Sequence, residues 1–238
     1  MHSQGHCVVI TGGTRGIGAA LGRKFLKNGN HVILIGRPDS RERQQMGGDF
    51  IACDLVHPRA RAELAERLLN DYPDMNVLIN NAGVRLDGLF HDQHRYHNYA
   101  REIEVNINAM VDLTDRLLPA LKGHPHASAI VNVSSSFAIQ PHLTSPIYSA
   151  SKAFIHSFST SLRQQLHSHN IRIIELVPPA VDTEMTRGQR HHKISPHQLT
   201  NIFWHGWLTN QHIIYGGQSR LLYLLNRISP HLAQRVAN

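Results

Sequence analysis

The sequence predicts an α/β fold, a single-domain doubly wound parallel sheet, because three observations agree. The chain of 238 residues has the length of one larger α/β domain. Short apolar runs alternate with segments of helical periodicity almost from the first residue. The runs are near-continuous in Val, Ile and Leu, as in strands buried on both faces of a parallel sheet. Strands separated by helices then require right-handed crossovers.

The first half of the chain alternates strand and helix. Apolar runs predict strands over residues 6–11, 31–36, 49–54 and 77–80. The first helix covers residues 16–28, where Ile17, Leu21 and Phe25 recur at helical spacing before Gly29 ends it. The second helix covers residues 58–71 and begins at Pro58, a residue suited to a first helical turn.

The second half continues the alternation and then becomes less regular. A long helix is expected over about residues 96–122, a helix over 148–168, and strands over 129–133 and 171–177. Beyond them we expect a helix at 196–208, a last strand at 212–215 and a short apolar, basic helix at 219–228. That last helix is interpreted as a packed terminal element or an oligomer contact, with a membrane-surface helix as the alternative.

Composition and charge exclude several classes of protein. Hydrophobic residues are 41% and charged residues 17%, but no apolar run approaches the roughly 20 residues of a membrane span. The polar start lacks the pattern of a secretory signal, so we expect a cytoplasmic protein. The net charge is +7 with histidine neutral, yet the basic residues are scattered and no aromatic residues interleave with them. We therefore expect no nucleic-acid partner.

The cysteines and histidines predict neither a disulfide nor a metal site. Cys7 and Cys53 lie in or beside strands that a third strand should separate, so both are expected as free thiols. Among 19 histidines, those at positions 91, 94 and 97 could share a helical face. No His-Glu-x-x-His or Cys-x-x-Cys motif supports a metal, and neighbouring arginines would repel a cation.

A glycine-rich turn follows the first strand and opens the first helix, in the sequence Thr11-Gly-Gly-Thr-Arg-Gly-Ile-Gly18. Gly12 permits a sharp turn, and Gly16 and Gly18 let the helix start approach a ligand and the sheet. Backbone amides and the positive end of the helix then face a phosphate. This context predicts a Rossmann-like dinucleotide site.

Four separated residues carry the candidate chemistry: Asn106, Ser135, Tyr148 and Lys152. Tyr148 and Lys152 are four apart and share a helical face. An ammonium beside a phenol lowers the phenol pKa from about 10 toward neutrality, so Tyr148 is expected to exchange a proton with a carbonyl or an alcohol. Ser135 is expected to orient and polarise the substrate oxygen.

The joint pattern resembles the short-chain dehydrogenase/reductase family. It consists of the spacing Gly12-x3-Gly16-x-Gly18, Asn80-Asn-Ala-Gly83, Ser135, Tyr148-x3-Lys152, and Pro178 followed by Thr183. The resemblance implies that Ser135, thirteen positions before the tyrosine, is the active serine among three in a row. It also implies that Lys152 holds the nicotinamide ribose and that Asn106 supports a water-linked proton path. The cofactor-binding residues predicted from the turn and the resemblance are Gly12, Thr14, Arg15, Gly16, Ile17, Gly18, Arg37, Asp54, Leu55, Asn81, Ala82, Gly83, Tyr148, Lys152, Pro178, Val181 and Thr183.

The residue that ends the second strand distinguishes the two nicotinamide cofactors. An acid there favours the free ribose hydroxyl, and an arginine favours a 2′-phosphate. This chain has Arg37 and no acid at that point, and Arg15 adds a second guanidinium. NADP(H) is therefore preferred over NAD(H). Asp39 is the counter-argument, because a shifted loop could bring it to the ribose.

The leading hypothesis is an NADP(H)-dependent oxidoreductase that acts on a ketone or secondary alcohol. The alternatives are a dinucleotide sensor or scaffold without turnover, and an epimerase or dehydratase acting on nucleotide sugars. Residues 1–183 would form the cofactor and catalytic core, and 184–238 the substrate loop and C-terminal segment. A medium-sized substrate with a polar or acidic tail is expected. The pocket wall is predicted to include Phe137, Ile139, His142, Ile147, Pro179 and parts of 184–208.

Two further expectations come from the family. A homodimer or homotetramer is expected through the helices that hold residues 109–121 and 154–166. Relatives usually show Pro-Gly after the sixth strand, whereas this chain has Pro178-Pro179. That departure and the stretch 216–220 are similar to a bacterial subgroup named after the teichoic-acid D-alanylation operon. The second proline should stiffen the wall beside the nicotinamide.

Overall fold

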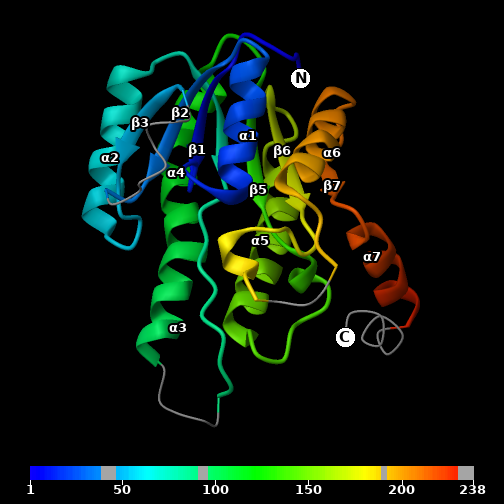
Figure 1. The fold of residues 1–238 in the computed structure, drawn as a ribbon. Coiled ribbons are helices and arrows are strands. Elements are labelled where there is room, and N and C mark those ends of the chain that lie inside the picture. The colour runs from blue at the N-terminus through cyan, green and yellow to red at the C-terminus, as the bar shows by residue number, and fades with distance from the viewer. Residues whose placement is uncertain (39–46, 91–95, 189–191, 230–238) are drawn as a thin grey trace.

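A parallel sheet of seven strands forms the centre of the computed structural model, which describes residues 1–38, 47–90, 96–188 and 192–229. The strands are β1 (Cys7–Thr11), β2 (His31–Gly36), β3 (Asp49–Ala52), β4 (Met75–Asn80), β5 (Ser128–Val133), β6 (Ile171–Val177) and β7 (Ile213–Tyr215). Their order is β3-β2-β1-β4-β5-β6-β7, and every neighbouring pair is parallel (Figure 1). Successive strands are added on one side of β1 up to β3 and on its other side from β4 onward, and this switch in strand order between β1 and β4 creates the crevice where such sheets bind ligands.

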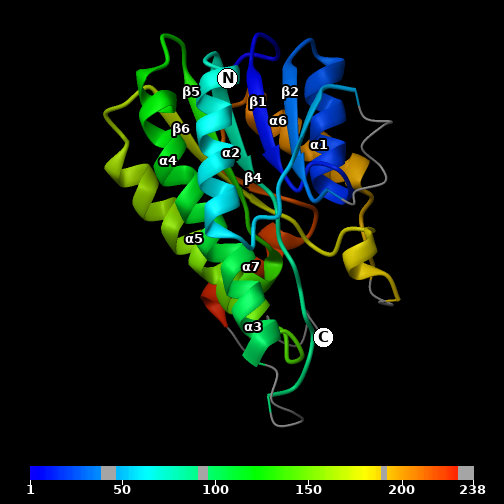
Figure 2. The same ribbon diagram turned by 90° about the vertical axis from the view of Figure 1, so that its left-hand side faces the viewer.

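Helices cover both faces of this sheet. The main ones are α1 (Gly16–Lys27), α2 (Pro58–Asp71), α4 (Ala109–Gly123), α5 (Pro146–Gln165) and α6 (Pro196–Leu208). Helices α2, α4 and α5 lie together on the face that Figure 2 turns toward the viewer, and α1 and α6 lie behind the sheet. Helix α7 (Ser219–Ile228) lies beyond the β7 edge. The doubly wound fold is therefore as predicted.

Two apolar clusters, one on each face, hold the layers together. Leu64 and Leu68 of α2 pack with Leu113 and Leu117 of α4 against one face. On the other face Phe25 of α1 makes edge-to-face contacts with Trp204 and Trp207 of α6, at ring-centroid distances of 5.2 and 5.3 Å. Strand side chains point alternately into the two clusters, which explains why the strand sequences are apolar at consecutive positions.

The structure corrects the predicted long helix over 96–122. Helix α3 (Tyr96–Ile103) and α4 are joined by a π-helical segment, Glu104–Asn108, whose centre is Asn106. The wider turn adds a residue that helical periodicity alone does not reveal. The predicted third strand was also too long, because β3 ends at Ala52.

The prediction of free cysteines is confirmed within the described residues. Cys7 and Cys53 are buried free thiols, with β2 between their strands. None of the described helices has the length and apolar character needed to cross a bilayer. The described ranges also contain no group of three potential metal ligands. Residues 91 and 94 of the histidine pattern lie outside these ranges, as does Asp39.

Candidate active site

The predicted site residues gather at one edge of the sheet, where the parallel strands end. The glycine turn follows β1, Arg37 follows β2, and Asp54 and Leu55 follow β3. Asn81 to Gly83 follow β4, Ser135 follows β5, and Pro178 to Thr183 follow β6. Residues far apart in the sequence therefore face one crevice, as ligand sites of open α/β sheets do.

The glycine turn has the tight geometry that a bound phosphate needs. Gly12 and Gly16 have φ values of +63° and +56°, which disfavour any residue with a side chain. A Cβ atom on Gly18 would lie 2.3 Å from the carbonyl oxygen of Gly12. Arg15 occupies the N-cap of α1, and no side chain caps that end of the helix. The first amides of α1 can therefore serve an anion, so the turn fits a dinucleotide phosphate.

A hydrogen-bond network joins this turn to the loop after β4. The hydroxyl of Thr11 accepts from the amides of Asn81 and Ala82, at 3.0 and 3.1 Å. The side-chain amide of Asn81 donates to the carbonyls of Thr11 and Gly12, at 2.9 and 3.1 Å. The structure therefore gives Asn81 a role inside the protein, namely to fix the glycine turn against the β4 loop.

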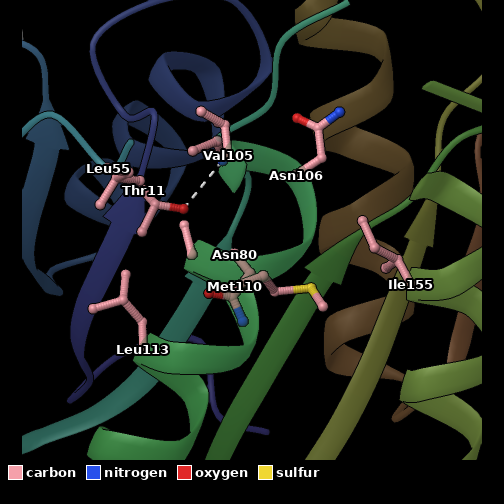
Figure 3. Close-up of a pocket in the computed structure, with 10 residues that line it drawn as sticks. Thr11, Leu55, Asn80, Val105, Asn106, Met110, Leu113 and Ile155 are labelled. Carbon is pink, nitrogen blue, oxygen red and sulfur yellow. Dashed lines mark hydrogen bonds between the residues drawn. The ribbon is translucent and has the colours of Figure 1, made fainter. Parts of the chain in front are cut away.

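A small pocket lies behind this network, between β1, β4 and the start of α4 (Figure 3). Three predicted site residues from separate segments, Leu55, Ala82 and Asn106, contribute to its lining. The close-up shows side chains from the two strands and from the π-helical segment around the same space. The fold thus brings these three residues together.

Asn106 connects the β4 loop to α5. Its amide nitrogen donates to the carbonyl of Val84 at 2.9 Å and to the hydroxyl of Ser151 at 3.2 Å. Its amide oxygen accepts from the backbone amide of Val84 at 2.8 Å. A Cβ atom on Gly83 would be 3.4 Å from Asn106 Oδ1 and 3.6 Å from Lys152 Nζ. Asn106 and Lys152 therefore both face the backbone of Gly83.

Tyr148 and Lys152 lie on the first turns of α5 and are both buried. The hydroxyl of Ser135 lies near the Tyr148 phenol and lowers its pKa. Ser135 Oγ also accepts from the amide of Phe137 at 3.2 Å, which fixes the serine in front of the tyrosine. Lys152 Nζ donates to the carbonyl of Val133 at 2.9 Å and lies 5.4 Å from the centroid of the Tyr148 ring.

The expected lowering of the Tyr148 pKa by Lys152 is wrong for this structure. Burial raises the pKa of Tyr148 to about 12, and the Arg85 guanidinium and the Ser135 hydroxyl offset only part of that rise. Burial also lowers the pKa of Lys152 to about 8. Desolvation disfavours the charged form of each group and is the largest cause of both shifts. The phenol therefore carries its proton at neutral pH.

The comparison with protein families decides the assignment. A family model for the short chain dehydrogenases matches residues 6–194, which include every candidate site residue. The chain belongs to the short-chain dehydrogenase family. It is thus an NAD(P)-dependent oxidoreductase with a Rossmann-like fold.

Similar proteins agree with this assignment. The uncharacterized oxidoreductase DltE of Bacillus subtilis is 38% identical over 202 residues, which are 80% of this chain and 77% of that protein. Serine 3-dehydrogenase of Agrobacterium fabrum is 33% identical over 184 residues, 75% of this chain and 73% of that protein. A short chain dehydrogenase from Burkholderia cenocepacia, solved with NADP, has a TM-score of 0.88 and 24% identity and covers 100% of this chain and 99% of that one.

Two cationic residues predicted at the cofactor lie at the rim of the crevice of this short-chain dehydrogenase. Arg37 is exposed directly after β2. Arg15 forms an ion pair with Glu184, and both side chains are about half exposed, at 53% and 55%. Glu184 follows Thr183, so this pair joins the glycine turn to the segment after β6. The same segment is ordered by Thr186, whose hydroxyl accepts from the Thr183 amide at 3.2 Å.

The predicted substrate side is partly assembled by aromatic contacts. Phe137 packs edge to face on Tyr148 with ring centroids 5.9 Å apart, and His142 stacks on Phe137 at 5.0 Å. Helix α7 also contacts this region, because the Asn226 amide donates to the carbonyl of Ile139 at 3.1 Å. Pro179 lies against Gly216, on which a Cβ atom would be 2.8 Å from the proline ring.

A charged group beside Tyr148 was missed by the sequence analysis. Arg85 Nε lies 3.1 Å from the carboxylate of Asp87, which itself accepts from Ser145. Glu102, only 1% exposed, accepts from the Leu86 amide at 3.0 Å. Burial raises the pKa of Glu102 to about 7. Arg85 follows the Asn-Asn-Ala-Gly motif by two residues, and that proximity was the available signal.

A second buried carboxylate was also missed. Glu175 of β6 is fully buried and accepts from the hydroxyl of Ser134 at 2.6 Å and from His156 Nδ1 at 2.8 Å. The hydrogen bond to Glu175 raises the pKa of His156. Ser134 thus points away from Ser135, as strand alternation predicts. An acidic residue between apolar neighbours, in the run Ile173-Ile174-Glu175-Leu176-Val177, was the signal that could have identified Glu175.

Proposed function

We propose that this short-chain dehydrogenase transfers a hydride between NADP(H) and a ketone or secondary alcohol, with Tyr148 as the acid/base. One observation carries the proposal: the Ser135 hydroxyl lies near the Tyr148 phenol and lowers its pKa, at the edge of the sheet that also holds the phosphate-binding turn. Two neighbouring hydroxyls can hold a substrate oxygen between them. That arrangement suits proton exchange at a carbonyl oxygen.

Each residue can be given a role in the reduction. The bound nicotinamide supplies the hydride. Ser135 donates to the carbonyl oxygen and polarises it, and Tyr148 gives its proton to that oxygen as negative charge develops there. Because burial raises the Tyr148 pKa to about 12, the phenol is protonated and ready for this step at neutral pH. Lys152, positioned by the Val133 carbonyl, would hold the cofactor ribose near Gly83.

The test of this proposal is the variant Tyr148→Phe. Removal of one hydroxyl should reduce kcat by at least about 10³-fold, within the range attributed to general acid–base catalysis. The ring and its contact with Phe137 remain, so the dissociation constant for NADPH, measured by fluorescence titration, should change less than about threefold. Full activity in this variant would contradict the proposal. A dinucleotide sensor would bind NADPH but give no turnover in wild type.

The preference for NADP(H) rests on Arg15 and Arg37, the two guanidiniums at the rim. The Burkholderia cenocepacia enzyme of the same fold was solved with NADP. Guanidinium groups bind phosphate in bidentate fashion and have no equivalent partner in NADH. In Arg37→Ala, kcat/KM should fall about tenfold or more for NADPH and stay unchanged for NADH. An equal loss with both cofactors would overturn the preference.

The substrate is proposed to be a ketone of medium size with a polar or acidic tail. Phe137 and His142 provide an aromatic wall on the substrate side of Tyr148. The serine 3-dehydrogenase relative is named for a hydroxy acid substrate. A screen of carbonyl compounds with NADPH and NADH in parallel identifies the substrate, and a screen without any turnover would reject the enzyme hypothesis.

Assembly as a homodimer or homotetramer is proposed through α4 and α5. Phe154 on α5 is 38% exposed and stacks on Phe158 with ring centroids 5.9 Å apart. Phe158 also packs against the apolar cluster of α2 and α4, so the two rings extend the core to the surface. Light scattering on wild type and Phe154→Glu tests this surface, since a buried charge would dissociate the assembly.

A further inference from the structure

We infer that Arg85 binds an anionic group of the substrate, a carboxylate attached close to the carbonyl that is reduced. The inference rests on the proposed function and deepens it, because it assigns a residue and a charge to the substrate class. Neither the family motifs nor the names of the relatives assign a role to this position.

The location of Arg85 is the first argument. It lies two residues after Gly83, whose backbone faces Asn106 and Lys152. Its side chain is only 8% exposed, so most of it is shielded from bulk solvent. The guanidinium carbon is 6.0 Å from the centroid of Phe137, the ring that packs on Tyr148. One aromatic ring therefore connects the guanidinium to the reacting phenol.

The fixed orientation of Arg85 is the second argument. Asp87 holds its Nε from one side at 3.1 Å, and its NH2 donates to the carbonyl of Met185 at 3.4 Å. Both contacts come from loops at the carboxyl edge, one after β4 and one after β6. A guanidinium with a fixed plane loses little conformational entropy when it binds a carboxylate. The longer bond to Met185 is the contact that a charged ligand would displace most easily.

The local charge balance is the third argument. The described residues whose charges act on Tyr148 are Arg85, which lowers its pKa, and Glu102 and Asp87, which raise it. Glu102 is buried with a pKa of about 7, so near neutral pH it is in part uncharged. The positive charge of Arg85 and the negative charge of Asp87 then nearly cancel in their effect on the surroundings of Tyr148. A substrate with one negative charge then meets no net negative charge at this position, and the guanidinium can attract it.

A different role is conceivable from the same contacts, because Arg85 joins two loops. In that case its loss would loosen the site for every substrate. In the anion-binding role its loss would affect acids and spare neutral ketones. The two roles therefore predict different patterns of KM and kcat.

The experiment compares keto acids with their neutral esters. We use 3-oxobutanoate and 4-oxopentanoate, each beside its ethyl ester, with NADPH and wild type, Arg85→Gln and Arg85→Lys. The control is Arg59→Gln, since Arg59 is 93% exposed on α2 and forms an ion pair with Glu63 one turn along the same helix. NADPH binding by fluorescence and far-UV circular dichroism verify that each variant is folded and loaded.

In Arg85→Gln, KM for the acids should rise about 10- to 100-fold, the range for a lost hydrogen bond to a charged group. In the same variant KM for the esters should change less than threefold, and kcat should stay unchanged for acids and esters. For Arg85→Lys, KM for the acids should lie between the values of wild type and Arg85→Gln, because lysine keeps the positive charge but lacks the two parallel N–H donors of a guanidinium. The inference would be overturned if Arg85→Gln raised KM equally for acids and esters, or changed KM for neither. It would also be overturned if the wild-type protein reduced the esters but none of the acids.

The inference can also be decided without turnover. Titration calorimetry measures 3-hydroxybutanoate binding to the wild-type protein saturated with NADPH, a pair between which no hydride can pass, and no binding, or equal binding in Arg85→Gln, rejects the anion site. If wild type binds this carboxylate through Arg85 but reduces no carbonyl compound, the anion site stands and the proposed oxidoreductase activity fails.

Discussion

Glu102 makes the fold sensitive to pH, and the variant Glu102→Gln should remove that sensitivity. The carboxyl is 1% exposed, and burial is the main cause that raises its pKa from 4.5 to about 7. Between these two values the folded protein keeps a proton that the unfolded chain has lost. The free energy of unfolding therefore falls as pH rises through this window.

The size of the effect follows from the pKa. Each pKa unit is worth about 1.4 kcal/mol, so the interval from 4.5 to about 7 corresponds to about 3 kcal/mol above pH 7. Glutamine keeps an oxygen for the Leu86 amide, which donates to Glu102 at 3.0 Å, and carries no ionisable group. The variant should match wild type at pH 4.5 and exceed its stability by about 2–3 kcal/mol at pH 8.

Urea unfolding at fixed protein concentration, at intervals from pH 4.5 to 8, measures this difference. Glu63→Gln is the control, because Glu63 lies on the exposed face of α2 and its side chain is 67% exposed. A stability difference between Glu102→Gln and wild type that does not change with pH would refute the reasoning. A variant less stable at pH 8 would refute it as well.

Three further predictions concern the site and its support. The variant Glu184→Gln releases Arg15 from its exposed ion pair. NADPH should then bind up to about fivefold tighter in a fluorescence titration, and the affinity for NADH should not change. Weaker NADPH binding would contradict this prediction. Gly18→Ala places a Cβ 2.3 Å from the Gly12 carbonyl and should abolish NADPH binding, whereas retained affinity would show that the turn adapts. Protonated His156 stabilises the fold fully below pH 6.5, and this contribution should disappear as pH rises through its raised pKa. His156→Gln should therefore cost stability at pH 5.5 but little at pH 9 in the same unfolding assay.

The order of elements and the position of the site could be read from the sequence, because both depend on local patterns. Apolar runs separated by helices specify a parallel sheet, and a parallel sheet brings all loops after its strands to one edge. Ser135 and Tyr148 meet for this reason, although they belong to different elements. The π-helical turn at Asn106 was not predictable, since its added residue leaves no trace in the apolar spacing.

The electrostatics of the site could not be predicted from the sequence. Spacing alone placed Lys152 beside Tyr148, but only the structure reveals that both side chains are buried and that desolvation then dominates their pKa values. Arg85 and Glu102 escaped notice because they come from separate segments and become neighbours of Tyr148 only in the folded chain. Long-range charge contacts of this kind are set by topology rather than by local pattern.

The transfer of deuterium tests the central claim most directly, namely that Tyr148 and Ser135 hold a carbonyl oxygen while hydride comes from the nicotinamide. The protein is given NADPH carrying deuterium at C4, in separate 4R and 4S forms, and a ketone from the carbonyl screen. We expect wild type to place the label from one of the two forms on the carbinol carbon of the product, and Tyr148→Phe to form no labelled alcohol above background. Unlabelled alcohol from both forms, or labelled alcohol at the wild-type rate from Tyr148→Phe, would contradict the account.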